Sequence, residues 1–312
     1  MKISKRLIVT GGAGFIGSNL VNKLVELGNN VIVIDNFATG NIEKLKKVKD
    51  KIEIINEDIA NIKDLQKKLR KYKNNVDVIF HLAAIPRVER SVDKISETHQ
   101  SNVQGIFGVL ELAKFLEINK LIYTSSSSVY GSQKKNPLSE SFIPNPQNPY
   151  AAQKLIGEIY ADIYSKVFGI PIVTLRLFNV YGPGMEEEGA YKLVFAKWIG
   201  QIKKGEPLSI YGDGKQTRDF TYVSDTVGAL IKASNLKHKN LHEIINIGSG
   251  RQISVNYLAS LFDAPKVFVE SRKFEERFKQ ADIRKARRLL SYSPKVTIEE
   301  GVKEFKKQEK IR

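Results

Sequence analysis

A glycine-rich segment near the N-terminus, Thr10-Gly-Gly-Ala-Gly-Phe-Ile-Gly-Ser18, limits the possible folds more than any other feature of the chain. It follows a short apolar run at 6–10 and precedes a stretch at 16–27 in which apolar residues recur at helical spacing. Glycine allows a tight turn and a close approach of the backbone to a phosphate, whose charge the N-terminus of the next helix stabilises. The glycines at 11, 14 and 17 therefore predict a dinucleotide site between the first strand and the first helix.

Short apolar runs alternate with longer amphipathic stretches over the first 177 residues. We expect strands at 6–10, 31–34, 51–55, 76–80, 120–124 and 170–176, and helices at 16–27, 59–70, 91–117 and 149–168. Strands rich in Val and Ile that alternate with helices are typical of a parallel sheet covered on both faces. The sequence predicts an α/β fold with a doubly wound parallel sheet.

Loops rich in glycine and proline replace this rhythm beyond residue 177. We therefore expect two domains. The first covers residues 1–176 and is joined by a later strand near 219–247, and a smaller mixed α/β domain covers residues 177–312.

The composition excludes several kinds of site. Cysteine is absent, which excludes disulfides, Cys-ligated metal centres and thiol nucleophiles. The four histidines are scattered, so we predict no metal site. The formal net charge of +16 can mark nucleic-acid or membrane-surface partners, but lysines spread over solvated helix faces are the better explanation, and we expect no nucleic-acid partner.

No apolar run approaches the roughly 18 residues of a membrane span, and the N-terminus does not resemble a signal peptide, so we expect a cytoplasmic protein. Abundant Lys, Glu and Ile, with only two Met and no Cys, also fit a heat-adapted proteome.

An acidic residue ends the second expected strand. Asp35 lies about 20 residues beyond the glycine loop, where a carboxylate accepts hydrogen bonds from the adenosine ribose. The same charge repels a 2′-phosphate, and no arginine follows closely, so the sequence predicts NAD rather than NADP. Asp58, after the third expected strand, has two interpretations: an acceptor for the adenine amino group, or the N-cap of the helix at 59–70.

A serine run and a Tyr–Lys pair follow the later strands. The run lies in Thr124-Ser-Ser-Ser-Ser-Val-Tyr-Gly131, and Pro149 suits the start of the next helix. Tyr150 and Lys154 are four residues apart and therefore share a helix face. Tyrosine titrates near pH ~10, so a base acting near neutrality needs a pKa about 3 units lower. We predict that the lysine cation and the positive end of the nicotinamide lower it, and that a serine hydroxyl relays the proton.

Together these motifs resemble the extended short-chain dehydrogenase/reductase superfamily, in particular its NAD-dependent nucleotide-sugar epimerase/dehydratase family, over essentially the whole chain. The resemblance implies a Rossmann-type domain that binds NAD and a smaller domain that binds the nucleotide sugar. It assigns the catalytic roles to Ser126, three residues before the valine of Val-Tyr-Gly, to the base Tyr150 and to its partner Lys154.

The motifs and the resemblance together assign a larger set of residues to the cofactor. Phe80-His-Leu-Ala-Ala84 resembles the segment beside the nicotinamide, and Asn102 matches the helix asparagine behind it. The full set is Gly11, Gly14, Phe15, Ile16, Gly17, Asp35, Asn36, Asp58, Ile59, Leu82, Ala83, Ala84, Asn102, Tyr150 and Lys154.

The resemblance also implies residues that hold the nucleotide sugar. Asn179 and Arg218 match residues that bind its phosphates, and a planar, permanently charged guanidinium suits that role. Arg272 and Glu275 align with an Arg-Pro-Gly-Glu segment that contacts phosphate and ribose, although this chain lacks the Pro-Gly. The full substrate set is Ser126, Ser127, Tyr150, Asn179, Arg218, Arg272 and Glu275.

The two residues after the catalytic hydroxyl separate the reactions of the family. Its 4,6-dehydratases carry Asp-Glu there, and its decarboxylases keep the glutamate, whereas this chain has Ser127 and Ser128. The resemblance therefore implies a 4-epimerase that acts on UDP-glucose and UDP-galactose or on the N-acetylated pair. The acidic segment after Gly184 disfavours a sugar carboxylate, and Lys279, at the rim of the expected hexose pocket, either snorkels out or narrows that pocket.

Two alternatives stay open: another nucleotide-sugar reductase or dehydratase, and a non-catalytic nucleotide- or RNA-binding relative supported only by the net charge. The family also implies a homodimer that packs the helices near 100–117 and 150–168 together.

Overall fold

The computed structural model describes residues 4–86, 88–185, 194–237, 240–271 and 277–311. Its centre is a sheet of seven parallel strands: β1 (Arg6–Thr10), β2 (Asn30–Asp35), β3 (Ile52–Asn56), β4 (Val78–His81), β5 (Lys120–Ser126), β6 (Ile172–Leu177) and β11 (His242–Ile247). Their order is β11-β6-β5-β4-β1-β2-β3. The order reverses between β1 and β4, and a doubly wound sheet binds its ligand at such a point, beyond the carboxyl ends of the strands.

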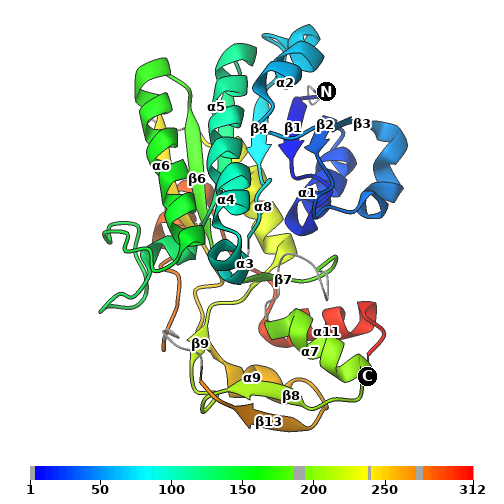
Figure 1. The fold of residues 1–312 in the computed structure, drawn as a ribbon, viewed down its shortest axis with the longest axis vertical. Helices are drawn as coiled ribbons and strands as arrows, with labels where there is room; N and C mark the ends of the chain where they lie inside the picture. The colour runs from blue at the N-terminus through cyan, green and yellow to red at the C-terminus, as the bar shows by residue number, and fades with distance from the viewer. Residues whose placement is uncertain (1–3, 87, 186–193, 238–239, 272–276, 312) are drawn as a thin grey trace.

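Alternate residues of each strand point to opposite faces of the sheet, and both faces are covered. On one face, Leu7 and Val9 pack in a core with α1 (Phe15–Glu26), α8 (Val223–Ser234) and α10 (Arg284–Leu290). On the other, Ile8 packs in a core with α2 (Ile62–Leu69), α5 (Gly105–Leu116) and α6 (Pro149–Phe168). Figure 1 shows α5 and α6 side by side at one edge of the molecule, with α6 outermost. The predicted fold class is confirmed.

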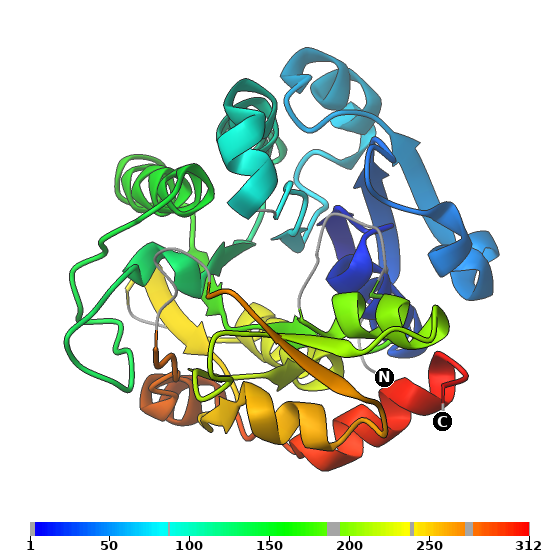
Figure 2. The ribbon, with the colours of Figure 1, turned by 60° about the horizontal axis from the view of Figure 1, so that its bottom comes forward.

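A smaller unit lies at the end of the sheet toward which the strands run (Figure 1). It contains α7 (Val194–Lys203), α9 (Val255–Ser260), α11 (Ile298–Gln308) and the parallel pair β8 (Leu208–Tyr211) and β13 (Lys266–Val269). Its core is rich in aromatic rings, among them Trp198, Phe195 and Phe305, which are fully buried. Figure 2 brings this unit forward and shows its helices and its two-stranded ribbon layered below the sheet.

Short strand pairs connect the two units. β7 (Val180–Tyr181) pairs with β10 (Thr221–Tyr222), and β9 (Thr217–Arg218) pairs with β12 (Ile253–Ser254). The chain then returns to the seven-stranded sheet: α8 packs on β5 and β6, and β11 pairs with β6. The chain thus crosses between the two units more than once.

The helix predicted at 91–117 is wrong as a single element. The structure divides this region into α3 (Val88–Asp93), α4 (Ile95–His99), a π-helical turn (Gln100–Gln104) and α5. A π turn inserts one residue into the helical repeat, so side chains on either side of it no longer share one stripe. Apolar periodicity detects the helical turns but not this break.

Candidate active site

Two glycines, one in the loop after β1 and one in the first turn of α1, meet backbone atoms at distances that no side chain would tolerate. A Cβ on Gly11, whose φ is +69°, would lie 2.6 Å from the backbone nitrogen of Ala83. A Cβ on Gly17 would lie 2.0 Å from the carbonyl oxygen of Gly11. The loop therefore packs directly under the segment that leaves β4, and α1 begins close enough to direct its N-terminus at a ligand.

Asp35 ends β2 and is buried. Its carboxylate accepts hydrogen bonds from the backbone amides of Ala13 and Phe37, both at 2.9 Å. Burial raises its pKa, which these two amides and the charge of Lys44 partly oppose. A carboxylate has about four acceptor positions, so this group fixes the glycine loop and can still accept from a ribose hydroxyl.

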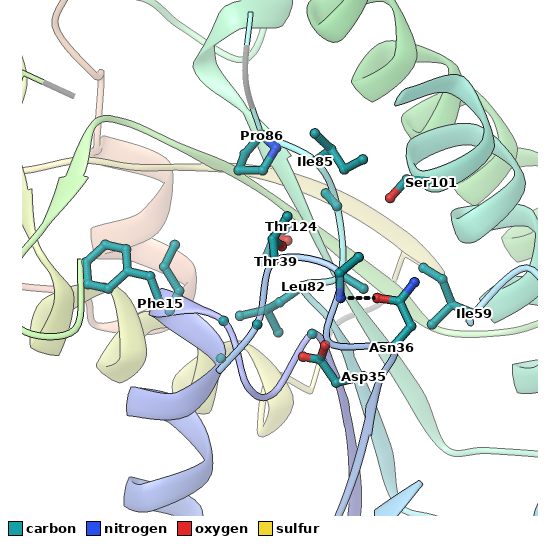
Figure 3. Close-up of a pocket in the computed structure, with 18 of the residues that line it drawn as sticks. Phe15, Asp35, Asn36, Thr39, Ile59, Leu82, Ile85, Pro86, Ser101 and Thr124 are labelled. Carbon is teal, nitrogen blue, oxygen red and sulfur yellow. Dashed lines mark hydrogen bonds between the residues drawn. The ribbon is translucent and has the colours of Figure 1, made fainter. Parts of the chain in front are cut away.

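Asn36 and Asp58 form one polar group at the ends of β2 and β3. The Asn36 side chain donates to Asp58 at 2.8 Å and accepts from the amide of Ala38 at 3.0 Å, the dashed line of Figure 3. Asp58 also accepts from the amide of Ala60, two residues on. The interpretation of Asp58 as a helix N-cap is wrong, because that position is occupied by Asn61. Asp58 instead closes the turn before α2.

A pocket of about 380 Å³ runs along the carboxyl ends of the strands (Figure 3). Every residue that the sequence assigned to the cofactor lines it, with the exception of Asn102. Residues that the sequence analysis did not assign also line it, including Ala38, Thr39, Gly40, Lys44, Pro86 and Ser101. The first four follow Asp35 in the chain, so the turn after an acidic strand end is the signal that could have identified them.

Ser126, Tyr150 and Lys154 line the same pocket. Ser126 is the last residue of β5, and its hydroxyl lies close enough to Tyr150 to oppose the rise in the pKa of the phenol. Tyr150 lies in the first turn of α6, where Asn148 caps the helix and Pro149 is its first residue. Lys154 lies one turn further along and donates to the carbonyl oxygen of Thr124 at 2.8 Å. The structure therefore brings together the three residues that the sequence proposed as catalytic.

The protein alone does not lower the pKa of Tyr150. Burial raises that pKa to about 12, and the nearby Ser126 hydroxyl opposes the shift only in part. Burial also lowers the pKa of Lys154 to about 8, against the charge of Glu158. In the ligand-free chain the lysine does not lower the phenol pKa, and the lowering expected from the lysine together with the nicotinamide stays a prediction for the NAD-bound site. Desolvation outweighs the helix-face pairing.

Asn102 lies behind the pocket wall instead of on it. Its side chain is buried, accepts from the amide of Ile85 at 2.8 Å and donates to the carbonyl of Ile85 and to Gln153 of α6. Gln153 in turn donates to Thr98. This network, at the π turn, joins the segment after β4 to the helix that carries Tyr150.

Of the substrate residues of the second half, the structure describes Asn179 and Arg218. Asn179 donates to the carbonyl of Asp219, and Arg218 donates to that of Thr217, and neither lines the cavity. Ser127 is buried after β5. Lys279 is only 9% exposed, so its side chain does not extend into solvent. Arg272 and Glu275 lie outside the described residues.

Asp219 is a polar residue that the sequence analysis missed. It is fully buried and accepts from Ser249, from the amide of Gly250 and from that of Ala281. It thereby fixes the segments on either side of its neighbour Arg218. Position next to a proposed ligand was the only signal for it in the sequence.

The fold and the pocket define a Rossmann-type protein that binds a dinucleotide beside a Ser–Tyr–Lys set. The chain belongs to the NAD dependent epimerase/dehydratase family, whose model matches residues 7–248. Its cofactor is accordingly NAD.

Relatives and solved structures cover nearly the whole chain. A putative UDP-glucose 4-epimerase of Methanocaldococcus jannaschii is 36% identical over 95% of this chain and 96% of its own. The UDP-glucose 4-epimerase of Thermotoga maritima, solved with UDP-glucose, is 33% identical with a TM-score of 0.90 over 97% of this chain and 98% of its own. The UDP-glucuronic acid 4-epimerase of Bacillus cereus, solved with UDP-glucuronic acid and NAD, is 37% identical with a TM-score of 0.88 over 98% and 99%. Other relatives are named decarboxylases of UDP-sugars.

Two features are absent from the part of the chain that the structure describes. No helix among them is both long and apolar enough to cross a membrane. Nor do they contain a cluster of three or more His, Asp or Glu side chains able to hold a metal ion.

Proposed function

We propose that this protein interconverts the C4 epimers of a UDP-hexose through a transient 4-keto sugar, with NAD bound throughout. The observation that carries the proposal is the placement of Ser126, Tyr150 and Lys154 on the wall of the nucleotide pocket, at the carboxyl end of β5. When bound, NAD supplies the hydride acceptor and the positively charged ring. The residues that would hold it are the loop after β1, Asp35 and the segment Leu82–Ala84.

Each of the three side chains has a definite task in this reaction. The Tyr150 oxygen accepts the proton of the sugar 4-hydroxyl during oxidation and returns it during reduction, and Ser126, which lines the pocket beside it, orients the sugar oxygen. Lys154 places a cation one helical turn away, where it favours the ionised phenol. Because Tyr150 is buried and its pKa is raised to about 12 in the free chain, its ionisation requires the positive charge that the loaded site adds.

The position of the carboxylates favours epimerisation over elimination. The acidic residues that line the described pocket are Asp35, Glu57, Asp58 and Glu97. Asp35 ends β2 and Glu57 and Asp58 follow β3, whereas β5 lies three strand spacings from β2, or roughly 14 Å. Glu97 forms an ion pair with Arg90. Where dehydratases of this family carry Asp-Glu, Ser127 and Ser128 follow Ser126.

We propose that the protein binds the UDP-sugar mainly through its nucleoside diphosphate. Asn179, Arg218 and Arg272 would bind the diphosphate and Glu275 the ribose, which leaves the hexose free to turn over between the two hydride transfers. Relatives named for UDP-glucose and for UDP-glucuronic acid are similarly identical to this chain. The choice of a neutral hexose therefore depends on the acidic segment after Gly184, which opposes a sugar carboxylate.

The test is direct. Purified protein with NAD is incubated separately with UDP-galactose, UDP-N-acetylglucosamine and UDP-glucuronic acid, and the sugars are separated by chromatography. We expect interconversion of a neutral UDP-hexose and its loss in Tyr150→Phe, which keeps the ring and removes the hydroxyl. No interconversion of any of the three, or full activity of the phenylalanine variant, would overturn the proposal.

We also propose a homodimer. Apolar side chains on one face of α6 are exposed: Ile159 by 53%, Ile163 by 46% and Val167 by 65%. They are four residues apart and form a stripe on the outermost helix of Figure 1. A second copy of the chain would cover this stripe, as the family resemblance implies.

A further inference from the structure

A buried ion pair lies one helical turn beyond the catalytic lysine. Glu158 of α6 and Arg176 of β6 have side chains that are each 3% exposed. The guanidinium donates to both carboxylate oxygens, from Nε at 2.9 Å and from Nη2 at 2.6 Å. Such a pair rarely stabilises a fold more than apolar side chains of the same volume would. Its presence here therefore suggests a role other than stability.

The same carboxylate holds the end of β5. Ser125 donates to Glu158 at 2.5 Å. Its two neighbours are Thr124, whose carbonyl accepts from Lys154, and Ser126, which lines the pocket beside Tyr150. The contact of one carboxylate with one serine thus fixes the backbone that positions both catalytic partners.

The helix also lies unusually close to the strand at this level. A Cβ on Gly157 would lie 2.3 Å from the Tyr123 hydroxyl, and that hydroxyl donates to the carbonyl oxygen of Lys154 at 3.2 Å. A displacement of Glu158 is therefore transmitted to the backbone of Lys154, because the helix and the strand have no free space between them at this level.

The charges around Lys154 come from three neighbouring elements. On its own helix lie the Tyr150 phenol and Glu158, and on β5 the ring of Tyr123 lies 5.2 Å from Nζ. His81 of β4 stacks on that ring and stays neutral near pH 7, because burial lowers its pKa to about 3. On β6, Arg176 is paired with Glu158. Among these described groups, Glu158 supplies the negative charge.

We propose that Glu158, held by Arg176, is a positioning residue that fixes the strand end bearing Ser126 and supplies the negative charge facing the Lys154 ammonium. The inference rests on the proposed epimerase function for its kinetic readout only. It explains why a buried carboxylate lies two turns from the catalytic tyrosine on the same face of α6. It also gives the ion pair a chemical consequence at the site.

The experiment compares wild-type protein with Glu158→Gln, which keeps an acceptor for Ser125 and removes the charge. Lysine labelled with ¹³C at Cε is titrated by NMR in the ligand-free protein, and the Lys154 resonance is identified by its absence in Lys154→Met. We expect its titration midpoint to fall by about one pH unit in Glu158→Gln, because an opposite charge at this range raises a lysine pKa by about that much. An unchanged midpoint overturns the electrostatic half of the proposal.

Kinetics test the positioning half. We expect kcat of Glu158→Gln to fall about tenfold with KM nearly unchanged, and the alkaline limb of the kcat profile to move to lower pH. Unchanged kcat overturns this half, whereas a wild-type protein without turnover sinks the epimerase proposal and leaves the NMR result to decide the electrostatic half. If Glu158→Gln does not fold, Glu158→Met with Arg176→Met replaces both charges, and a smaller fall of the midpoint is expected, because the repulsion by the Arg176 guanidinium is removed as well. Ser165→Ala, at another buried position of α6, is the control and leaves the midpoint and the pH profile unchanged.

Discussion

Replacing Lys154 by methionine should increase the free energy of unfolding near neutral pH but not at high pH. The same substitution should abolish turnover. Lys154 is 4% exposed, and burial lowers its pKa from 10.5 to about 8. A shift of that size corresponds to about 3 kcal/mol of unfavourable burial of the ammonium at pH 7. Methionine removes this term but also the charge-assisted hydrogen bond to Thr124, worth about 2 kcal/mol. We expect a net gain of about 1 kcal/mol at pH 7.

The pH dependence isolates the charge from the lost hydrogen bond. The pKa of Lys154 is lower in the folded chain than in the unfolded chain, so between pH 8 and 10.5 the unfolded chain binds more protons and wild-type stability rises with pH. Lys154→Met lacks this rise. Its net gain of about 1 kcal/mol at pH 7 should therefore become a net loss of about 1 kcal/mol at pH 9.5, a change of about 2 kcal/mol.

The assay is urea unfolding of both proteins, freed of nucleotide, at pH 7 and 9.5, followed by circular dichroism. Lys303→Met, at an exposed position of α11, is the matched control and should show no such change. A difference between wild type and Lys154→Met that is the same at both pH values would refute the reasoning, because it would mean that the lysine is not held at a burial penalty. Turnover should fall at least about 100-fold.

Three further outcomes are expected. Gly17→Ala should reduce NAD affinity at least about tenfold by calorimetry, since its Cβ would meet a carbonyl oxygen at 2.0 Å. Gly200→Ala, with open space in α7, should instead raise stability by up to ~1 kcal/mol. Equal effects of the two substitutions on NAD affinity and on stability would contradict the packing argument. Asp35→Asn should weaken NAD binding and disturb the glycine loop, because an amide accepts through one oxygen only; unchanged affinity would be evidence against its role. Ile163→Glu with Val167→Glu should convert a dimer to a monomer in size-exclusion chromatography with light scattering, and an unaltered dimer would place the interface elsewhere.

Much of the fold could be predicted because strands and helices leave different periods in the sequence. The strand of residues 6–10 is found as expected, and Pro149 begins α6 as its ring geometry suggests. The π turn at Gln100–Gln104 could not be predicted, because it is set by side chains that meet only in the folded chain. Asn102 needs Ile85 and Gln153 as partners, and those residues are distant in sequence.

The candidate site was predictable in its members but not in its electrostatics. Spacing alone places Tyr150 and Lys154 on one helix face, and the carboxyl ends of parallel strands bring Ser126 to them. Burial, however, depends on what covers a residue, and no local pattern reports it. For that reason the sequence suggested a lowered phenol pKa, whereas desolvation raises it.

The two burial shifts oppose the charged states that proton transfer requires. Tyr150 resists ionisation and Lys154 resists protonation when the chain is ligand-free, so the resting site holds a neutral phenol near pH 7. Only a group that brings positive charge beside the phenol reverses this balance, and Glu158 keeps the ammonium available when it does. In the proposed reaction, a phenolate that forms only when NAD is bound is confined to the protein that also holds the hydride acceptor. Burial disfavours both the Tyr150 phenolate and the Lys154 ammonium when each is considered alone. It thereby restricts the ionised pair to the complex in which the pair is used.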